Sequence, residues 1–543
     1  MEAKPIELTQ QANLIKDYRD RKESIYKHFQ YDPFQLRSFR SRYEYLMGQT
    51  YKREALVKVL KEQNERWVMT SKVQQNIEAL LDEKSTVVIG GQQTGLLTGP
   101  LYTIHKIVSI IIQANEMSEY LKSPVIPVFW MAGEDHDFLE IDHVFTYQDQ
   151  ELNKVRIDDE TPFDYKSPIS KREIPVVEAE RFIDQVFETF QETEHTKELY
   201  ETVRQSLNNS KTYVDFFACF LNQLFEKDGL VLVDADERNL RMLERDYFIR
   251  MVENREDIAT KTAERLKALT ASGYHINLDA KSTDAHLFYH HDGERLLLEV
   301  DTNGRYRSKG GEVSFLEAEL KELIYHSPEQ FSNNVVTRPL MQEFVFPVLS
   351  FVGGPGEIGY WSSLKGAFEA VNLQLPIVTP RLSLTLMKRN HQSIMNQYHV
   401  DETDLINNGT YQDKMSWLKR QSKYPLEETV QQVKKQMEVA HQPLQEIAQS
   451  VSNDMAALTE TNLKQIEDEI NYVEKKLYHA IKGQHQDVVL RFDDLDSFYY
   501  PLGGLQERVW NVVYWLNEYG LDLPESLTKI PPRFEQDHQI VIL

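Results

Sequence analysis

Short apolar runs alternate with amphipathic stretches over most of this chain. Five runs have the length and composition of buried parallel strands, and each leads into a polar or glycine-rich loop: 86–89, 125–131, 230–233, 344–352 and 376–378. Helical stretches lie between them, for example 101–121 and 358–371. Strand, loop and helix in alternation predict an α/β fold built on a doubly wound parallel sheet.

A different pattern begins near Leu426, where apolar residues recur at alternating steps of four and three. The seam consists of Leu426, Val430, Val433, Met437, Ala440, Leu444, Ile447, Val451, Met455 and Leu458, and then of Leu463, Ile466, Ile470, Val473, Leu477 and Ile481. This heptad repeat predicts two helices joined by a turn at 459–462, the first kinked at Pro443. Two interpretations stay open. The narrow seam favours a projecting antiparallel coiled coil that also dimerises over two surface helices packed on the core.

The two patterns divide the chain into parts. We expect the core in residues 1–150 and 293–385, a helical coiled-coil domain in 386–490, and a C-terminal segment in 491–543. Residues 151–292 are rich in charge, contain helical stretches at 177–190 and 254–269, and interrupt the strand–helix rhythm, so they are interpreted as an insertion. The apolar end 540–543 is expected to pack back on the core.

Composition narrows the function classes. A chain of 543 residues is too long for one hydrophobic core, so we expect two or three domains. Its net charge of −24 argues against nonspecific binding to nucleic acid or to anionic membranes. Residues 1–22 contain no apolar targeting segment, so we expect a cytoplasmic protein with no membrane span. The single cysteine, Cys219, lies in an apolar helical stretch and is interpreted as a buried hydrophobic residue rather than a nucleophile.

A glycine-rich polar loop joins the first predicted strand to the following helix. Gly90, Gly91, Gln92 and Thr98 are expected to surround the positive end of that helix, with Pro100 as its first residue. The spacing of Gly90 and Gly95 fits a P-loop, but Leu96 and Leu97 stand where Lys and Ser/Thr are required, and no G-x-G-x-x-G occurs. The pattern favours a ligand-binding loop, and a tight turn whose glycines only permit close packing remains the alternative.

Four ionisable residues, Glu134, Asp135, His136 and Asp137, follow the second predicted strand. Such a cluster needs a positive partner, which could be a substrate amine, a metal ion or an internal arginine, and the crowding would raise at least one carboxylate pKa enough for proton transfer. A solvated turn with helix-capping acids is the alternative.

Three further loops carry polar groups to the ends of predicted strands. Arg338 is a candidate for gripping a carboxylate or phosphate, Glu357 stands at a helix start, and Arg381 ends the last core strand. Because the carboxyl ends of parallel strands meet at one edge, all these loops are expected to converge there. His286, His290, His291 and Asp292 fit no standard zinc spacing, so no metal site is assigned, although a metal requirement stays open.

Taken together, these motifs closely resemble the BshC family, the cysteine ligases of bacillithiol biosynthesis in Firmicutes. The motifs that carry the resemblance lie at 90–93, 105–106, 127–130, 134–138, 333–339, 354–357 and 506–508, in order and over essentially the whole chain. The resemblance implies a Rossmann-like core akin to class I aminoacyl-tRNA synthetases and nucleotidylyl transferases. It also implies a connecting-peptide insertion and a coiled-coil domain that makes a homodimer.

The resemblance further implies a reaction, in which cysteine is joined to the free amine of glucosaminyl malate to give bacillithiol. Amide formation from a free carboxylate is uphill in water, so activation by ATP is expected. The chain departs from the synthetase pattern, because 98–101 replaces the His-Ile-Gly-His motif and no Lys-Met-Ser-Lys-Ser loop follows the last core strand. Two alternatives stay open: another nucleotide-dependent ligase or nucleotidyl transferase on this scaffold, or a noncatalytic assembly protein.

Roles for individual residues follow as hypotheses. The loop 90–98 holds a carboxylate or phosphate with help from Arg338 or Arg381, while Glu134, Asp135 or Asp137 binds an amine, and His136 or one carboxylate takes its proton. The substrate-binding residues are expected to be Gly90, Gly91, Gln92, Gln93, Thr98, Tyr102, His105, Asn334, Arg338, Glu357, Tyr360 and Arg381.

Overall fold

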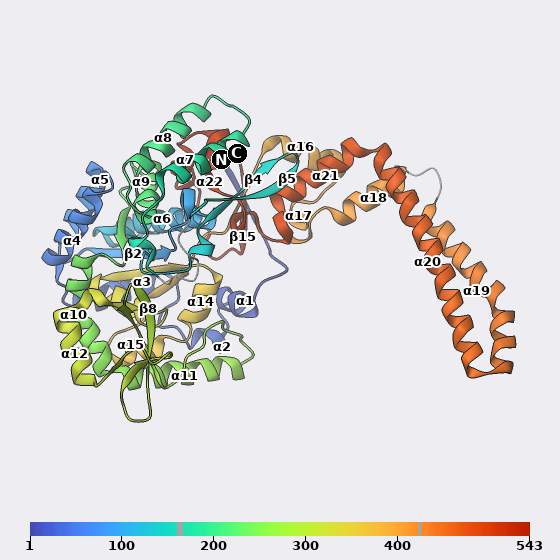
Figure 1. The fold of residues 1–543 in the computed structure, drawn as a ribbon. Coiled ribbons are helices and arrows are strands. Elements are labelled where there is room, and N and C mark those ends of the chain that lie inside the picture. The colour runs from blue at the N-terminus through green and yellow to red at the C-terminus, as the bar shows by residue number, and fades with distance from the viewer. Residues whose placement is uncertain (160–166, 422–424) are drawn as a thin grey trace. The chain divides into compact units, whose positions relative to one another are not determined.

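The computed structural model describes residues 1–159, 167–421 and 425–543. The chain forms two compact units, one from residues 1–386 together with 506–543 and the other from residues 387–505 (Figure 1). None of the helices in the described residues is both long and apolar enough to cross a membrane.

The first unit is built on a five-stranded parallel sheet. Its strands are β2 (Thr86–Gln92), β3 (Val125–Met131), β6 (Val231–Asp234), β12 (Val348–Gly353) and β13 (Ile377–Pro380), in the spatial order β13-β12-β2-β3-β6. Read from β6, this is the order 3-2-1-4-5, which matches the first five strands of the Rossmann order 3-2-1-4-5-6, and the order reverses between β2 and β12. The predicted α/β class is therefore confirmed. The crossover from β2 to β3 is α6 (Tyr102–Leu121), which is buried along most of its length.

The described residues of this unit form three further sheets. One is antiparallel and contains β7 (Asp284–His291), β8 (Glu294–Val300), β9 (Tyr306–Ser308), β10 (Ser314–Phe315) and β11 (Phe331–Asn333). A hairpin pairs β4 (His143–Gln148) with β5 (Glu151–Arg156). In the third, β15 (His538–Ile542) lies between β1 (Glu2–Ile6) and β14 (Leu384–Met387), so the apolar C-terminal strand does pack on this unit.

The helices that surround these sheets come from both the N-terminal and the C-terminal parts of this unit. They are α1 (Asn13–Arg19), α2 (Glu23–Tyr26), α3 (Leu36–Met47), α4 (Arg53–Glu65), α5 (Ser71–Ala79), α7 (Val176–Glu188), α8 (Thr196–Asn208), α9 (Tyr213–Leu224), α10 (Arg238–Glu253), α11 (Arg255–Ala271), α12 (Glu317–His326), α13 (Thr337–Val345), α14 (Pro355–Trp361), α15 (Lys365–Ala370), α22 (Val512–Tyr519) and α23 (Leu523–Leu527). Cys219 is buried in α9, as expected for a small hydrophobic residue, and burial raises the pKa of its thiol to about 11.

Some elements differ from the sequence prediction. The run 344–352 is not one strand, because its first residues end α13 and only Val348–Gly353 form β12. A fully buried helix has the same apolar composition as a buried strand, and Pro347 separates the two. The stretch 358–371 is divided between α14 and α15. Residues 151–292, interpreted as an insertion, supply β6 to the parallel sheet.

The second unit is helical. It contains α16 (Arg389–Tyr398), α17 (Glu402–Asn408), α18 (Tyr411–Gln421), α19 (Leu426–Val451), α20 (Asn453–Gln484) and α21 (Gln486–Tyr499). Helices α19 and α20 form the predicted hairpin, but the turn lies at Ser452 and not at 459–462. Ser452 has an extended backbone, and its side chain accepts a hydrogen bond from the Met455 N–H at 3.3 Å, so it caps α20.

Candidate functional site

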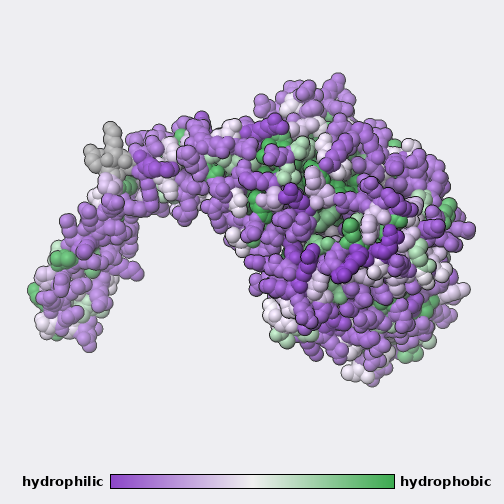
Figure 2. All heavy atoms as spheres, turned by 180° about the vertical axis from the view of Figure 1, so that it is seen from behind, coloured by the Kyte–Doolittle hydropathy of each residue, from purple (hydrophilic) through white to green (hydrophobic). Residues whose placement is uncertain are grey.

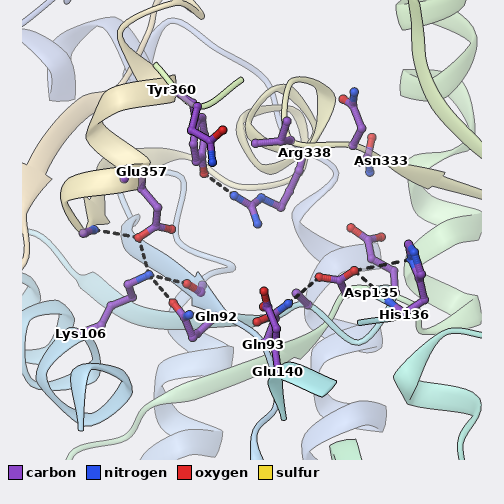
Figure 3. A pocket seen from close by; sticks show the side chains of 18 of the residues that line it. Gln92, Gln93, Lys106, Asp135, His136, Glu140, Asn333, Arg338, Glu357 and Tyr360 are labelled. Atoms are coloured by element: carbon purple, nitrogen blue, oxygen red, sulfur yellow. Dashed lines mark hydrogen bonds and ion pairs between the residues drawn. The ribbon is translucent and has the colours of Figure 1, made fainter. Parts of the chain in front are cut away.

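A cavity of about 860 Å³ opens at the carboxyl ends of the parallel strands. Its wall includes residues that follow β2, β3, β12 and β13, so it lies at the point where the strand order reverses. That is the usual ligand position in open α/β sheets. Figure 3 shows labelled side chains at the ends of β2, β3 and β12 pointing toward a common space.

Most of the residues proposed from the sequence line this cavity. They are Gly91, Gln92, Gln93, Tyr102, Glu134, Asp135, His136, Asn334, Arg338, Glu357, Tyr360 and Arg381. Four others do not line it: Gly90, Thr98 and His105 are buried behind the wall, and Asp137 is exposed outside it. A ligand in this cavity would not meet these four residues directly, and a role for them stays a prediction.

The glycine segment differs from the predicted anion cradle. Gly90 and Gly91 lie within β2, where a Cβ at Gly91 would stand 2.6 Å from the Trp130 carbonyl oxygen. Helix α6 begins at Tyr102, two residues after Pro100. The backbone N–H of Leu96 donates to the Ile141 carbonyl oxygen, and that of Gly99 donates to the Leu96 carbonyl oxygen. The N–H groups of Leu101 and Thr103 donate to the carbonyl oxygens of Trp510 and Pro100, respectively. Gly90 and Gly91 thus serve close strand packing, and some of the N–H groups of the loop already donate within the protein.

One corner of the cavity is organised by Lys106. Its ammonium donates to the Gly91 carbonyl oxygen at 2.6 Å, to Gln92 Oε1 at 2.9 Å and to Glu357 Oε2 at 2.5 Å. Glu357 also accepts the Gly354 N–H at 2.8 Å, which caps α14. Burial lowers the pKa of Lys106, and Glu357 opposes that shift. Figure 3 shows this cluster joining β2, α6 and α14.

The acidic corner centres on Asp135. Its Oδ2 accepts from Gln93 Nε2 at 2.9 Å, its Oδ1 accepts the His136 N–H at 2.8 Å, and the Arg295 guanidinium lies 3.6 Å away. The His136 ring nitrogen Nδ1 is 3.7 Å from the same carboxylate. Asp135 and His136 are both partly exposed on the wall, so either can meet a substrate amine (Figure 3).

Glu134 is placed differently from its neighbour. It is buried and pairs with Arg241, which also bonds Glu244 at 2.8 Å and lies 3.9 Å from Asp236. The positive partner that the acidic cluster requires is thus an internal arginine for this residue. Glu134 is thus committed to a buried ion pair, whereas Asp135 is the partly exposed carboxylate of the two.

Arg338 faces the acidic corner across the cavity. Its Nη2 donates to the Tyr360 hydroxyl, and its buried Nε has no hydrogen-bond partner among the described residues. No described carboxylate lies within ion-pair distance of this guanidinium, although nearby acids raise its pKa. Burial raises the pKa of Tyr360 to about 12, so the hydroxyl stays neutral. Arg338 can therefore accept an anionic group from a ligand.

Arg381 has a different environment. Both terminal nitrogens donate to the Glu507 carboxylate at 2.7 Å, so its charge is already paired within the protein. Lys106, Glu140, Asp279, Arg295, Asn333 and Arg508 also line the cavity and were not proposed from the sequence. Lys106, Asn333 and Arg508 lie within the motifs that carry the family resemblance, whereas Arg295 and Asp279 come from the region of the β7–β8 hairpin, where no motif marks them.

Two family models match this chain. Residues 1–382 match the N-terminal Rossmann-like domain of the bacillithiol biosynthesis protein BshC, and residues 384–543 match its C-terminal coiled-coil domain. The chain belongs to the BshC family. Proteins named "Putative cysteine ligase BshC" from Oceanobacillus iheyensis, Bacillus cytotoxicus and Bacillus anthracis are 34%, 38% and 36% identical to it, with 100% of each chain covered.

Membership of the BshC family confirms the predicted combination of a Rossmann-like domain with a coiled-coil domain. It also places the chain in bacillithiol biosynthesis and supports a ligase role. A solved structure titled as a putative arginyl-tRNA synthetase from Campylobacter jejuni matches with 13% identity and a TM-score of 0.22, over 86% of this chain and 99% of its own. That likeness is too weak to carry an argument.

Proposed function

We propose that this protein forms the amide bond between the carboxyl group of cysteine and the amine of glucosaminyl malate, the step that completes bacillithiol. The observation that carries the proposal is a cavity at the strand-order reversal in which Arg338, a guanidinium with no ion-pair partner among the described residues, faces an acidic corner at Asp135. Glucosaminyl malate has complementary groups, because its malyl part is anionic and its glucosamine nitrogen is a base.

Charge divides the proposed cavity into two subsites. The guanidinium groups of Arg338 and Arg508 meet the malyl carboxylates, since both line the cavity and neither has a carboxylate within ion-pair distance in the described residues. Asp135 and the exposed Glu140 meet the glucosamine nitrogen. Charge-assisted hydrogen bonds of this kind fix both ends of the substrate.

The reaction needs an activated carboxyl group, and ATP is proposed to supply it as an acyl phosphate or acyl adenylate. The amine nitrogen attacks the acyl carbon, the new C–N bond forms, and the C–O bond to the phosphate breaks. The proton that leaves the nitrogen passes to Asp135 or His136, which are the partly exposed titratable groups of the acidic corner. The proposed reaction takes place in the cytoplasm, because it needs ATP and cysteine as substrates.

Mass spectrometry of a reconstituted mixture tests this function. Purified protein with ATP, cysteine and glucosaminyl malate is expected to give a product with the combined mass of the two substrates less one water, together with AMP or ADP. A different nucleotide-dependent product would identify another ligase or transferase. No product with any nucleotide, combined with a stable complex with another pathway protein, would instead indicate a noncatalytic assembly role.

The helical hairpin is proposed to make a homodimer. Several residues of its seam remain open to solvent in the single chain, including Leu444 at 56% exposure, Ile447 at 62%, Val451 at 67% and Leu458 at 59%. Figure 2 shows hydrophobic side chains on the surface of this hairpin. A second copy would bury these residues, because a heptad seam presents its apolar residues to a partner helix.

A further inference from the structure

A short segment distant in sequence from the core strands reaches the wall of the cavity. It begins with the 3-10 turn η6 (Gln506–Arg508). The Gln506 side chain accepts the Leu386 N–H at 2.7 Å and donates to the Leu386 carbonyl at 3.0 Å, and Asn511 donates to the carbonyls of Leu97 and Gly99 at 2.9 and 2.7 Å. The segment is therefore fixed to β14 and to the loop before α6.

Glu507 is the centre of this segment. Its carboxylate accepts both terminal nitrogens of Arg381 at 2.7 Å, the His105 Nδ1–H at 2.9 Å and the Ser383 hydroxyl at 2.9 Å. Only 2% of Glu507 is exposed, and these partners hold its pKa well below the ordinary value against the effect of burial. One buried carboxylate thus connects α6, the end of β13 and the C-terminal segment.

We propose that Glu507 is a positioning residue of the active centre, which fixes Arg381 in the cavity wall and masks its charge so that anionic substrate groups bind at Arg338 and Arg508. This inference rests on the proposed function only for the identity of the anionic substrate, and the masking of Arg381 by Glu507 does not depend on it. Arg381 lines the cavity with its guanidinium 6.0 Å from the Tyr102 ring, and its N–H donates to the Gly353 carbonyl oxygen at 2.8 Å. A free guanidinium at this position would compete for the same anions.

The arrangement also determines how the neighbouring groups are charged. Burial lowers the pKa of His105, so its ring is neutral with the proton on Nδ1 facing Glu507. Lys106 is the next residue of α6, and Arg381 is one of the charges that lower its pKa. Loss of the Glu507 charge would leave the positive field of Arg381 uncompensated at Lys106 and at the cavity wall.

The competing explanation is that the Glu507–Arg381 ion pair only stabilises the fold. A double-mutant comparison of Glu507 and Arg381 distinguishes this explanation from the proposed masking of charge. Titration calorimetry with inorganic phosphate measures anion binding without requiring ligase activity. Glu507→Gln is expected to bind phosphate about tenfold more tightly, because an unmasked charge a few ångströms from an anion at a partly buried site is worth about that factor. The gain should vanish in Glu507→Gln/Arg381→Gln, where no charge is unmasked.

The control is Glu525→Gln in the same C-terminal segment. Glu525 pairs with Lys227 and Lys529 and does not line the cavity, so phosphate affinity should stay unchanged. Should Glu507→Gln fail to fold, Glu507→Asp, whose shorter side chain cannot span the same partners, is expected to show a smaller gain in the same direction. Three outcomes would overturn the proposal, whether or not bacillithiol is formed. They are an unchanged phosphate affinity in Glu507→Gln, a gain that persists in Glu507→Gln/Arg381→Gln, and no phosphate binding by any variant.

Discussion

Arg338 is the side chain on which recognition of an anionic substrate depends in the proposed site. We expect Arg338→Gln to weaken glucosaminyl malate binding about 10- to 100-fold, since a hydrogen bond to a charged group is worth about 1.5–3 kcal/mol. Calorimetric titration measures this change. Arg181→Gln is the control, because Arg181 is an exposed residue paired with Glu178 three positions earlier in α7. Equal affinities for the wild type and Arg338→Gln would remove Arg338 from the substrate site.

Asp135 and His136 are distinguished by their effects on turnover. Asp135→Asn retains the shape of the side chain and its acceptor for the His136 N–H but loses the charge. If Asp135 takes the amine proton, kcat should fall about 10²–10⁴-fold, the usual range for general acid–base catalysis. Steady-state rates of bacillithiol formation test this. Normal turnover in Asp135→Asn with a large loss in His136→Asn would assign the proton transfer to His136.

The sequence predicted which residues lie at the cavity where strand order determines their position, but it could not predict the side-chain partners that tertiary packing determines. Asp135 and Glu357 follow buried strands directly, so strand order alone brought them to the cavity. Glu134 belongs to the same motif but turns to Arg241, which lies more than a hundred residues later and carries no local signal. The pairing of Arg381 with Glu507 is likewise invisible without tertiary structure.

At the scale of elements, the packing of β2 against β3 depends on Gly91. A Cβ there would lie 2.6 Å from the Trp130 carbonyl oxygen, whereas a Cβ at Gly356, at the start of α14, would meet nothing within 4 Å. We expect Gly91→Ala to lower the thermal midpoint by several degrees, as backbone strain of about 1–3 kcal/mol would do. Gly356→Ala should leave it unchanged or raise it slightly. Calorimetric melting compares the two, and similar midpoints would contradict the packing role.

Periodicity located most elements but not all their ends. The predicted strand 125–131 coincides with β3, because the run is buried along its whole length and lies between Pro124 and Gly133, two residues that favour turns. The turn of the helical hairpin was predicted at 459–462, where the heptad pattern is interrupted, but α20 continues through those residues. The chain turns at Ser452, whose capping side chain was the more specific signal.

At the scale of the whole molecule, buried neutral histidines make stability depend on pH. Burial lowers the pKa of His28, His286 and His538 to about 4 and that of His290 to about 3. The unfolded chain binds these protons near 6.5 and the folded chain does not, so stability is lost as pH falls from 6.5 toward 4. Each histidine contributes about 1.4 kcal/mol per pH unit in that window.

His28 provides the sharpest test, because neither ring nitrogen has a hydrogen-bond partner among the described residues. His28→Leu should flatten the dependence of the thermal midpoint on pH between 6.5 and 4, whereas His275→Gln, at an exposed position, should not. Melting curves across this range measure the slopes. Parallel curves for the wild type and His28→Leu would show that His28 is not the group being protonated.

Assembly of the molecule is proposed to depend on the hairpin of α19 and α20. Replacing both Ile447 and Val451 with Asp puts charge into the exposed part of the seam, where the single chain gains little from either residue. The double variant should therefore fold normally but sediment as a monomer, because burying charge in a dimer interface costs several kcal/mol. The matched control places Asp at Gln449 and Ser450, which are exposed but lie off the seam. Analytical ultracentrifugation decides the matter: a wild-type monomer, or a double variant that still dimerises, would refute assembly through this seam.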